Sequence, residues 1–288
     1  MIKKNSISNL LILNLFLLLV SCNSDSEKEN FLTASISFLF TTDVRSGEEN
    51  PLLEKVNARL HLLGKEDKLV IEKKILINND GEGNIEHLDE GKWHINYWNI
   101  PSEAELYFDK NDNSINVIRT GDYLHEPAPF YAGVSDFNYV LNKPVRLKLK
   151  PQTGVLTIVL ILDDVANLSE TINGVLSGIV SKRVFEAQEM NISEQGIGHV
   201  SYLFTPSSYS PSTYIASQRL LGISNTQKCE LALSNDNISP VKIDLTTKLE
   251  TFNNLTTNNI LCVVHINKRI EVTIEVVDWE ERNYELDI

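Results

Sequence analysis

The chain has 288 residues, of which 42% are hydrophobic and 8% aromatic, which is enough apolar material for folded cores and argues against a disordered chain. Its formal net charge of -13 disfavours nucleic acid as a partner, because surfaces that bind phosphate are basic. The length suits one large or two modest domains.

The N-terminus has the layout of a secretory signal peptide. Lys3 and Lys4 supply positive charge, the stretch from Leu10 to Val20 is almost wholly apolar, and the small residue Ser21 follows it. The apolar stretch is about half of the roughly 20 residues that a membrane-spanning helix needs. We therefore expect residues 1–21 to be a removed leader and not a retained membrane span.

The motif Leu19-Val20-Ser21-Cys22 resembles the lipobox of bacterial lipoproteins, in which a small residue precedes the cysteine. The resemblance implies that residues 1–21 are a lipoprotein signal peptide and that Cys22 becomes the lipidated first residue, which binds the membrane through its lipid. The alternative is a plain signal peptide cut elsewhere, with Cys22 a stray thiol. Residues 22–30 are polar and acidic and are typical of a flexible tether.

Short strands separated by turn formers are expected from residue 31 to residue 150. Apolar and polar residues alternate with a period of two, which is typical of half-buried strands. The expected strands are 31–40, 56–63, 69–77, 91–100 and 144–149, with shorter edge or lid strands at 106–108, 115–118 and 130–133.

The second half begins with the most apolar stretch of the mature chain, Gly154 to Leu162, which predicts a central strand buried on both faces. Further strands are expected at 172–180, 199–204, 214–223, 229–233, 241–245, 260–266 and 270–277. Long segments with helical periodicity are missing. The pattern predicts an all-β protein of two tandem β-sandwich domains, an N-terminal domain at 31–150 and a C-terminal domain at 151–288.

Two cysteines remain after Cys22. Cys229 and Cys262 both lie in apolar, strand-like stretches. Export permits a disulfide between them, and two strands of one sandwich could bring them together. Two buried thiols that act as small hydrophobic residues are the alternative, and the sequence leaves both open.

The residues Trp93, Tyr97 and Trp98 form an aromatic cluster on one expected strand. Their ring faces could stack on sugars and form a ligand platform. Alternating aromatics on a strand can equally be core on one side and partial cover on the other.

Catalytic and metal chemistry finds little support in the sequence. The six histidines are scattered without ligand spacing, and neither a nucleophile elbow nor a phosphate-binding glycine loop occurs. Residues 109–114 alternate oxygen-bearing side chains but lack the glycine and distal glutamate of a calcium loop, so we expect a turn there. We expect no catalytic residue, metal or cofactor, and a protein that is not an enzyme.

The ending Val272-Thr-Ile-Glu-Val-Val-Asp-Trp279 resembles the close of fimbrillin-like lipoproteins, in which a last strand runs into an Asp-Trp or similar pair. The segments 91–99 and 146–158 agree in outline, and the resemblance covers nearly the whole mature chain by layout. It implies two transthyretin-like or immunoglobulin-like β-sandwich domains, outer-membrane lipidation at the cell surface, and a role as subunit or anchor of type V fimbriae. The implied partners are other fimbrial subunits.

Some major subunits of that group lose their N-terminal strand at a basic residue, which opens a groove for a neighbour's strand. Arg45, which follows the first expected strand, stands where such proteolytic processing could occur, although an ordinary surface arginine would look the same. The alternative function is a surface glycan-binding lipoprotein that uses the aromatic cluster and has glycans as partners.

Overall fold

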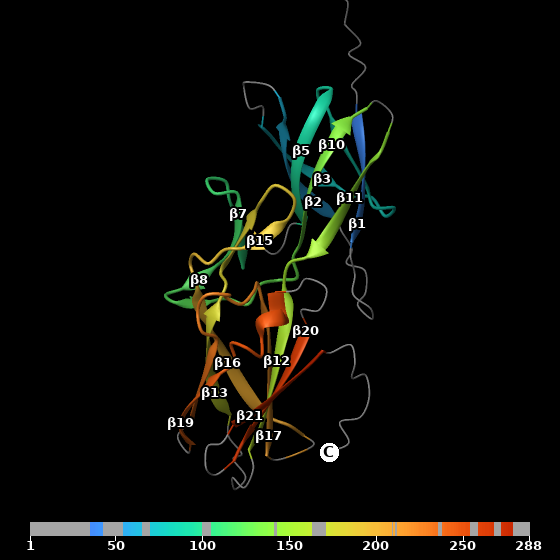
Figure 1. The fold of residues 1–288 in the computed structure, drawn as a ribbon. Helices are drawn as coiled ribbons and strands as arrows, with labels where there is room; N and C mark the ends of the chain where they lie inside the picture. Colours follow the sequence, from blue (N-terminus) through green and yellow to red (C-terminus); the bar gives the residue numbers. More distant parts are fainter. Residues whose placement is uncertain are drawn as a thin grey trace, which may run out of the picture.

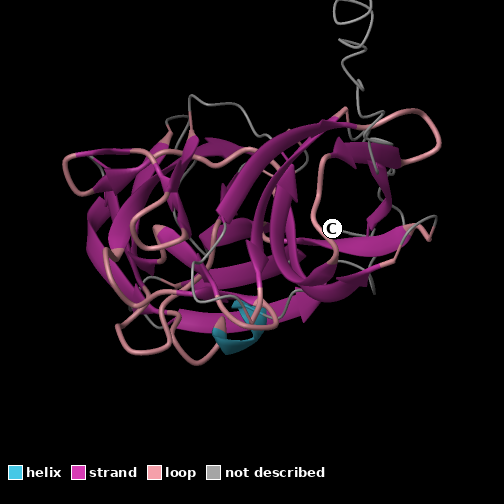
Figure 2. Ribbon diagram, turned by 90° about the horizontal axis from the view of Figure 1, so that it is seen from above, coloured by secondary structure: helices cyan, strands magenta, loops and turns pink. Residues whose placement is uncertain are grey.

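The computed structural model describes residues 35–42, 54–64, 70–99, 105–140, 143–162, 171–208, 210, 212–235, 238–253, 259–267 and 272–278. Strands dominate these ranges (Figure 2), and the one helical element within them is a 3₁₀ turn, η1 (Glu250–Asn253). No helix in the described ranges is long and apolar enough to cross a membrane. The predicted all-β class is confirmed.

The first sheet has seven strands in the described part of the chain. Their order is β3 (Val70–Leu76), β2 (Lys55–Leu62), β5 (Gly91–Asn99), β10 (Tyr131–Tyr139), β11 (Val145–Pro151), β1 (Ser35–Thr42) and β4 (Glu82–Glu86). The two ends of this order meet, because a Cβ added to Gly83 of β4 would collide with the side chains of Ile75 and Ile77. The sheet therefore curls around a single core.

The second sheet has ten strands, again counting described residues. Eight follow one path in the order β19 (Ile238–Asp244), β18 (Glu230–Asn235), β13 (Ile172–Ile179), β16 (Gly198–Pro206), β17 (Thr213–Leu220), β12 (Gly154–Leu162), β20 (Asn259–Ile266) and β21 (Val272–Asp278). The short strand β9 (Tyr123–Leu124) pairs with β16, and β8 (Arg119–Thr120) pairs with β9.

Strand β12 lies inside this sheet, as its apolar sequence predicted. It pairs antiparallel with β17 and parallel with β20. Seven of its nine residues are buried, so both of its faces are covered. The expected central, two-sided strand is confirmed.

A third sheet lies between the other two (Figure 1), in the order β15 (Met190–Ile192), β14 (Lys182–Phe185), β7 (Ser114–Val117) and β6 (Leu106–Asp109). It joins the two halves of the chain, since β7 pairs with β14 through Ser114–Val184, Ile115–Arg183 and Asn116–Lys182.

The described residues form two cores. The smaller lies within the first sheet, and the larger fills the second sheet and the junction. The larger core includes residues that precede position 150, namely Trp98, Leu106, Ile115, Val117, Leu124, Phe130 and Ala132. The division of the chain near residue 150 stays a prediction, and side chains from both sides of that position share the larger core.

A strand does cover most of the expected residues 130–133, but its predicted short length and edge or lid position were wrong. Strand β10 runs for nine residues and lies between β5 and β11 in the sheet order. Its second half is largely polar: Asp136 and Asn138 are exposed on one face, and Ser135 is partly exposed on the other. The polar positions therefore hid its length.

Candidate functional site

The candidate site is the position of strand β1 between β11 and β4 in the first sheet, which we call the seat of β1 (Figure 1). One edge of β1 pairs parallel with β11, from Phe38–Val145 to Thr42–Leu149. The other edge pairs antiparallel with β4, from Ser35–Glu86 to Leu39–Glu82. Backbone groups on both edges of β1 are thus hydrogen-bonded within the sheet.

The inward face of β1 is apolar. Ile36, Phe38 and Phe40 are all buried, and they stand at a period of two, so all three point to the same side. The Phe38 ring packs edge-on against Phe137 of β10 with centroids 5.6 Å apart, and the Phe40 ring lies 6.2 Å from Tyr97 of β5. Each such side chain contributes roughly 1.5–3 kcal/mol on burial.

A tight turn fixes the β4 side of the seat. Gly81 has a φ of +79°, a left-handed conformation that glycine adopts without strain. Its carbonyl accepts a hydrogen bond of 2.8 Å from the backbone N–H of Phe40. A Cβ on Gly81 would lie 2.8 Å from the carbonyl oxygen of Phe40, so a larger residue would push β1 out of register.

On the opposite side of the seat, Tyr97 connects β5 to β11 across β10. Its ring passes over Gly133, where a Cβ would collide with the Tyr97 ring and lie 2.6 Å from the carbonyl oxygen of Lys148. The Tyr97 hydroxyl donates to that carbonyl at 2.9 Å and accepts from the Lys148 backbone N–H at 3.1 Å. Burial raises the pKa of Tyr97 to about 12, so the hydroxyl stays protonated and can donate.

The three aromatics of the suggested sugar platform are buried. Trp93 and Tyr97 belong to the smaller core, and Trp98 points to the other face of β5 into the larger core. The Trp93 indole N–H donates to the carbonyl of Asp89 at 2.9 Å, and the Trp98 ring packs against the Phe108 ring in a tilted arrangement with centroids 4.5 Å apart. No face of these rings is open to a sugar in this arrangement, which favours the core alternative.

The turn at 109–114 uses its own oxygen atoms internally. Asp109 accepts from the backbone N–H of Asn111 at 2.9 Å, and Asp112 pairs with Lys182 and with Ser114. Among the described residues, no group of three or more His, Cys, Asp or Glu side chains could hold a metal ion.

Sequence reasoning missed how this turn is fastened to the first sheet. Arg59 of β2 donates to the carbonyl of Lys110 at 3.1 Å and lies over the Phe108 ring at 5.9 Å. Glu72 of β3 pairs with Lys110 and lies 3.9 Å from Arg59. The contacts from this turn to Arg59 and Glu72 span 38 or more positions of sequence and leave no local signal, so no motif could have revealed them.

Cys229 and Cys262 are both free and buried in the structure. Burial raises the pKa of each thiol to about 12. They share the larger core. Cys22 and Arg45 lie outside the described residues, so lipidation and processing stay predictions, as does a disulfide between Cys229 and Cys262.

No protein-family profile and no curated protein matches the sequence of this chain. Solved structures match it instead. The fimbrial anchor protein Mfa2 of Porphyromonas gingivalis aligns with a TM-score of 0.57 and 12% identity, over 85% of this chain and 97% of that one. This chain shares the fold of that anchor. The resemblance expected from the sequence is confirmed at the level of fold.

Two Bacteroides proteins share the fold as well. A candidate polysaccharide-binding protein of Bacteroides thetaiotaomicron aligns with a TM-score of 0.63 and 11% identity, over 87% of this chain and 100% of that one. A candidate adhesin of Bacteroides ovatus aligns with a TM-score of 0.61 and 14% identity, over 86% and 94%. The likeness extends over both sheets, because it covers most of each chain.

Replacing Phe38 tests how much the seat depends on its apolar face. We expect Phe38→Ala to lower the free energy of unfolding by about 3–5 kcal/mol, because it leaves a cavity in the core. Leu39→Ala is the matched control: Leu39 points to the other face and is partly exposed, so its loss should be under about 2 kcal/mol. Urea unfolding of both variants measures this, and equal losses would contradict the assigned face.

Thiol reactivity separates the two alternatives for the cysteines. In a Cys22→Ser chain kept free of reductant, we expect Cys229 and Cys262 to react little with a chromogenic disulfide reagent at about pH 8, because both thiols are buried and protonated. Unfolding in guanidinium should then release two reactive thiols. Thiols that react only after reduction would show that the two cysteines are bonded instead.

Proposed function

We propose that this protein is an outer-membrane-anchored lipoprotein of the cell surface that serves as a subunit or anchor of a fimbrium and acts in adhesion. The observation that carries the proposal is the seat of β1. This N-terminal strand is paired on both edges, and its side chains Ile36, Phe38 and Phe40 are buried in the core. The fold shared with a fimbrial anchor supports the same role.

Assembly would proceed by strand complementation. A sheet that lacks β1 would offer the unpaired backbone groups of β4 and β11, together with the apolar sites that the three β1 side chains now fill. An extended partner strand with apolar residues at a period of two satisfies both demands. Cleavage at Arg45, three positions after the end of β1, would free this strand from the rest of the chain; an anchor would keep it.

Attachment to the membrane would come from lipid on Cys22. Several acyl chains on one residue hold a protein far more firmly than a single chain does. The polar tether at 22–30 would then hold the two sheets away from the bilayer. The glycan-binding alternative gains no support from the aromatic cluster, since all three rings are buried.

Fractionation of cells tests the anchor. We expect Cys22→Ser to move the protein from the outer-membrane fraction to the soluble fraction, because it removes the lipid site. Ser26→Ala, in the same tether, is the matched control and should leave the protein with the membrane. A Cys22→Ser chain that stays in the membrane would contradict lipid attachment at this residue.

Co-purification tests the fimbrial role. A tagged full chain extracted in detergent should bring down fimbrial subunits, identified by mass spectrometry, and the mass of its N-terminal peptide reports whether residues 31–45 are retained. Arg45→Ala should abolish any cleavage there. If cleavage opens the groove, that variant should also lose subunits that bind through strand exchange. A chain that purifies alone in all forms would refute the fimbrial role.

A further inference from the structure

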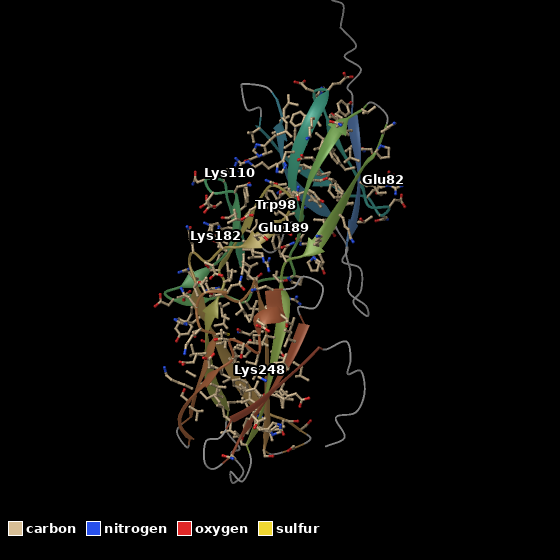
Figure 3. The ribbon with its side chains drawn as sticks, viewed as in Figure 1. Glu82, Trp98, Lys110, Lys182, Glu189 and Lys248 are labelled. Atoms are coloured by element: carbon tan, nitrogen blue, oxygen red, sulfur yellow. The ribbon has the colours of Figure 1, made fainter. Side chains whose placement is uncertain are left out.

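A small cleft lies where strands β10 and β11 part. Within the described residues the ladder between them has two pairs, Tyr131–Pro151 and Ala132–Lys150. Beyond these pairs, β10 follows β5 and β11 follows β1. Glu189, from the loop between β14 and β15, lines the side of the cleft opposite β11. Figure 3 shows Glu189 between the first and second sheets. The cleft has a volume of about 230 Å³.

One wall of the cleft is cationic. Arg146, Lys148 and Lys150 line it from alternate positions of β11, so their side chains leave the same face of the strand. All three are exposed. Of the described residues that line the cleft, one is acidic, Glu189. Three cations in one small cleft of a chain with a net charge of -13 favour an anionic ligand.

A second and independent feature points to a ligand. Gln152 lines the same cleft, and its side chain is 2% exposed. Its amide nitrogen donates to the carbonyl of Lys150 at 3.2 Å, but the side-chain oxygen Oε1 is buried without a hydrogen-bond partner among the described atoms. A buried acceptor without a donor is unfavourable, and a hydroxyl or N–H group of a bound molecule would satisfy it.

The size of the cleft narrows the choice. Its volume of about 230 Å³ equals roughly seven or eight waters at ~30 Å³ each, which suits a single small ring and not a folded segment of protein. The Tyr97 hydroxyl in the wall is already bonded twice to Lys148. Arg146, Lys150 and the oxygen of Gln152 are the groups that remain to recognise a ligand.

We propose that this cleft binds a carboxylate that also carries hydroxyl groups and has the size of one acidic sugar residue. The side chains of Arg146 and Lys150 would hold the carboxylate, Lys148 would add positive charge to the same wall, and Gln152 Oε1 would accept a hydrogen bond from a hydroxyl. This cleft shares β11 and Tyr97 with the seat of β1, but the binding of a small carboxylate there does not depend on the fimbrial role.

Calorimetric titration of the full chain in detergent tests the proposal, with D-glucuronate as the probe and D-glucose as its neutral match. We expect glucuronate to bind and glucose to bind at least about tenfold more weakly, since a charged hydrogen bond is worth about that factor. The double variant Arg146→Gln/Lys150→Gln, whose side chains are exposed, should weaken glucuronate by about tenfold or more. Lys74→Gln, an exposed cation of β3, is the control and should change nothing.

The hydroxyl contact is tested separately. Gln152→Met should bring the affinity for glucuronate close to that for acetate, which has the carboxylate alone. If that variant does not fold, the native chain still decides the point, because glucuronate should bind about tenfold more tightly than acetate or inorganic phosphate. Equal affinities for glucuronate and glucose, no binding of glucuronate, or phosphate binding as tight as glucuronate would each overturn the proposal.

Discussion

The first sheet depends on the double pairing of strand β1. In the sheet order, β1 is the link between β11 and β4, and β4 continues from β3 at the opposite end. Removing β1 would therefore do more than shorten an edge, because it would open a gap between β11 and β4 and expose the core that Ile36, Phe38 and Phe40 now cover. The burial of these rings and the hydrogen bonds on both edges act together, since each holds the strand in the register that the other requires.

Strand β5 gives the molecule its second constraint. Trp93, Ile95 and Tyr97 face the smaller core, and Trp98 faces the larger one, so one strand serves as a wall of both. The β6–β7 hairpin reinforces this connection: Arg59 and Glu72 hold its turn to the first sheet, and Lys182 holds it to β14 through Asp112. The contacts are polar on the outside and aromatic beneath, where Trp98 meets Phe108 and Phe185.

Much of this architecture could be predicted from alternation along the chain. The apolar stretch 154–162 became the central strand β12, and the expected strand at 91–100 became β5, which carries the aromatic cluster. Strands β4, β8, β9, β14 and β15 were missed, because they are short and their sequences hold few apolar residues to mark a period. The sequence predicted β1 as a strand but not its position in the sheet, because its parallel partner β11 lies about a hundred residues away. The cationic cleft depends on the divergence of β10 from β11, which no sequence pattern records.

The sharing of the larger core by residues on both sides of position 150 has a consequence for how the chain acquires its structure. Synthesis and export both deliver a chain from its N-terminus, and early segments tend to fold first. Trp98, Ile115 and Phe130 are made before the strands that shelter them, so these apolar groups must wait for roughly the next hundred residues. A chain that has emerged only as far as about residue 150 would expose apolar surface. We expect this intermediate to need protection from a chaperone until the remaining strands have formed.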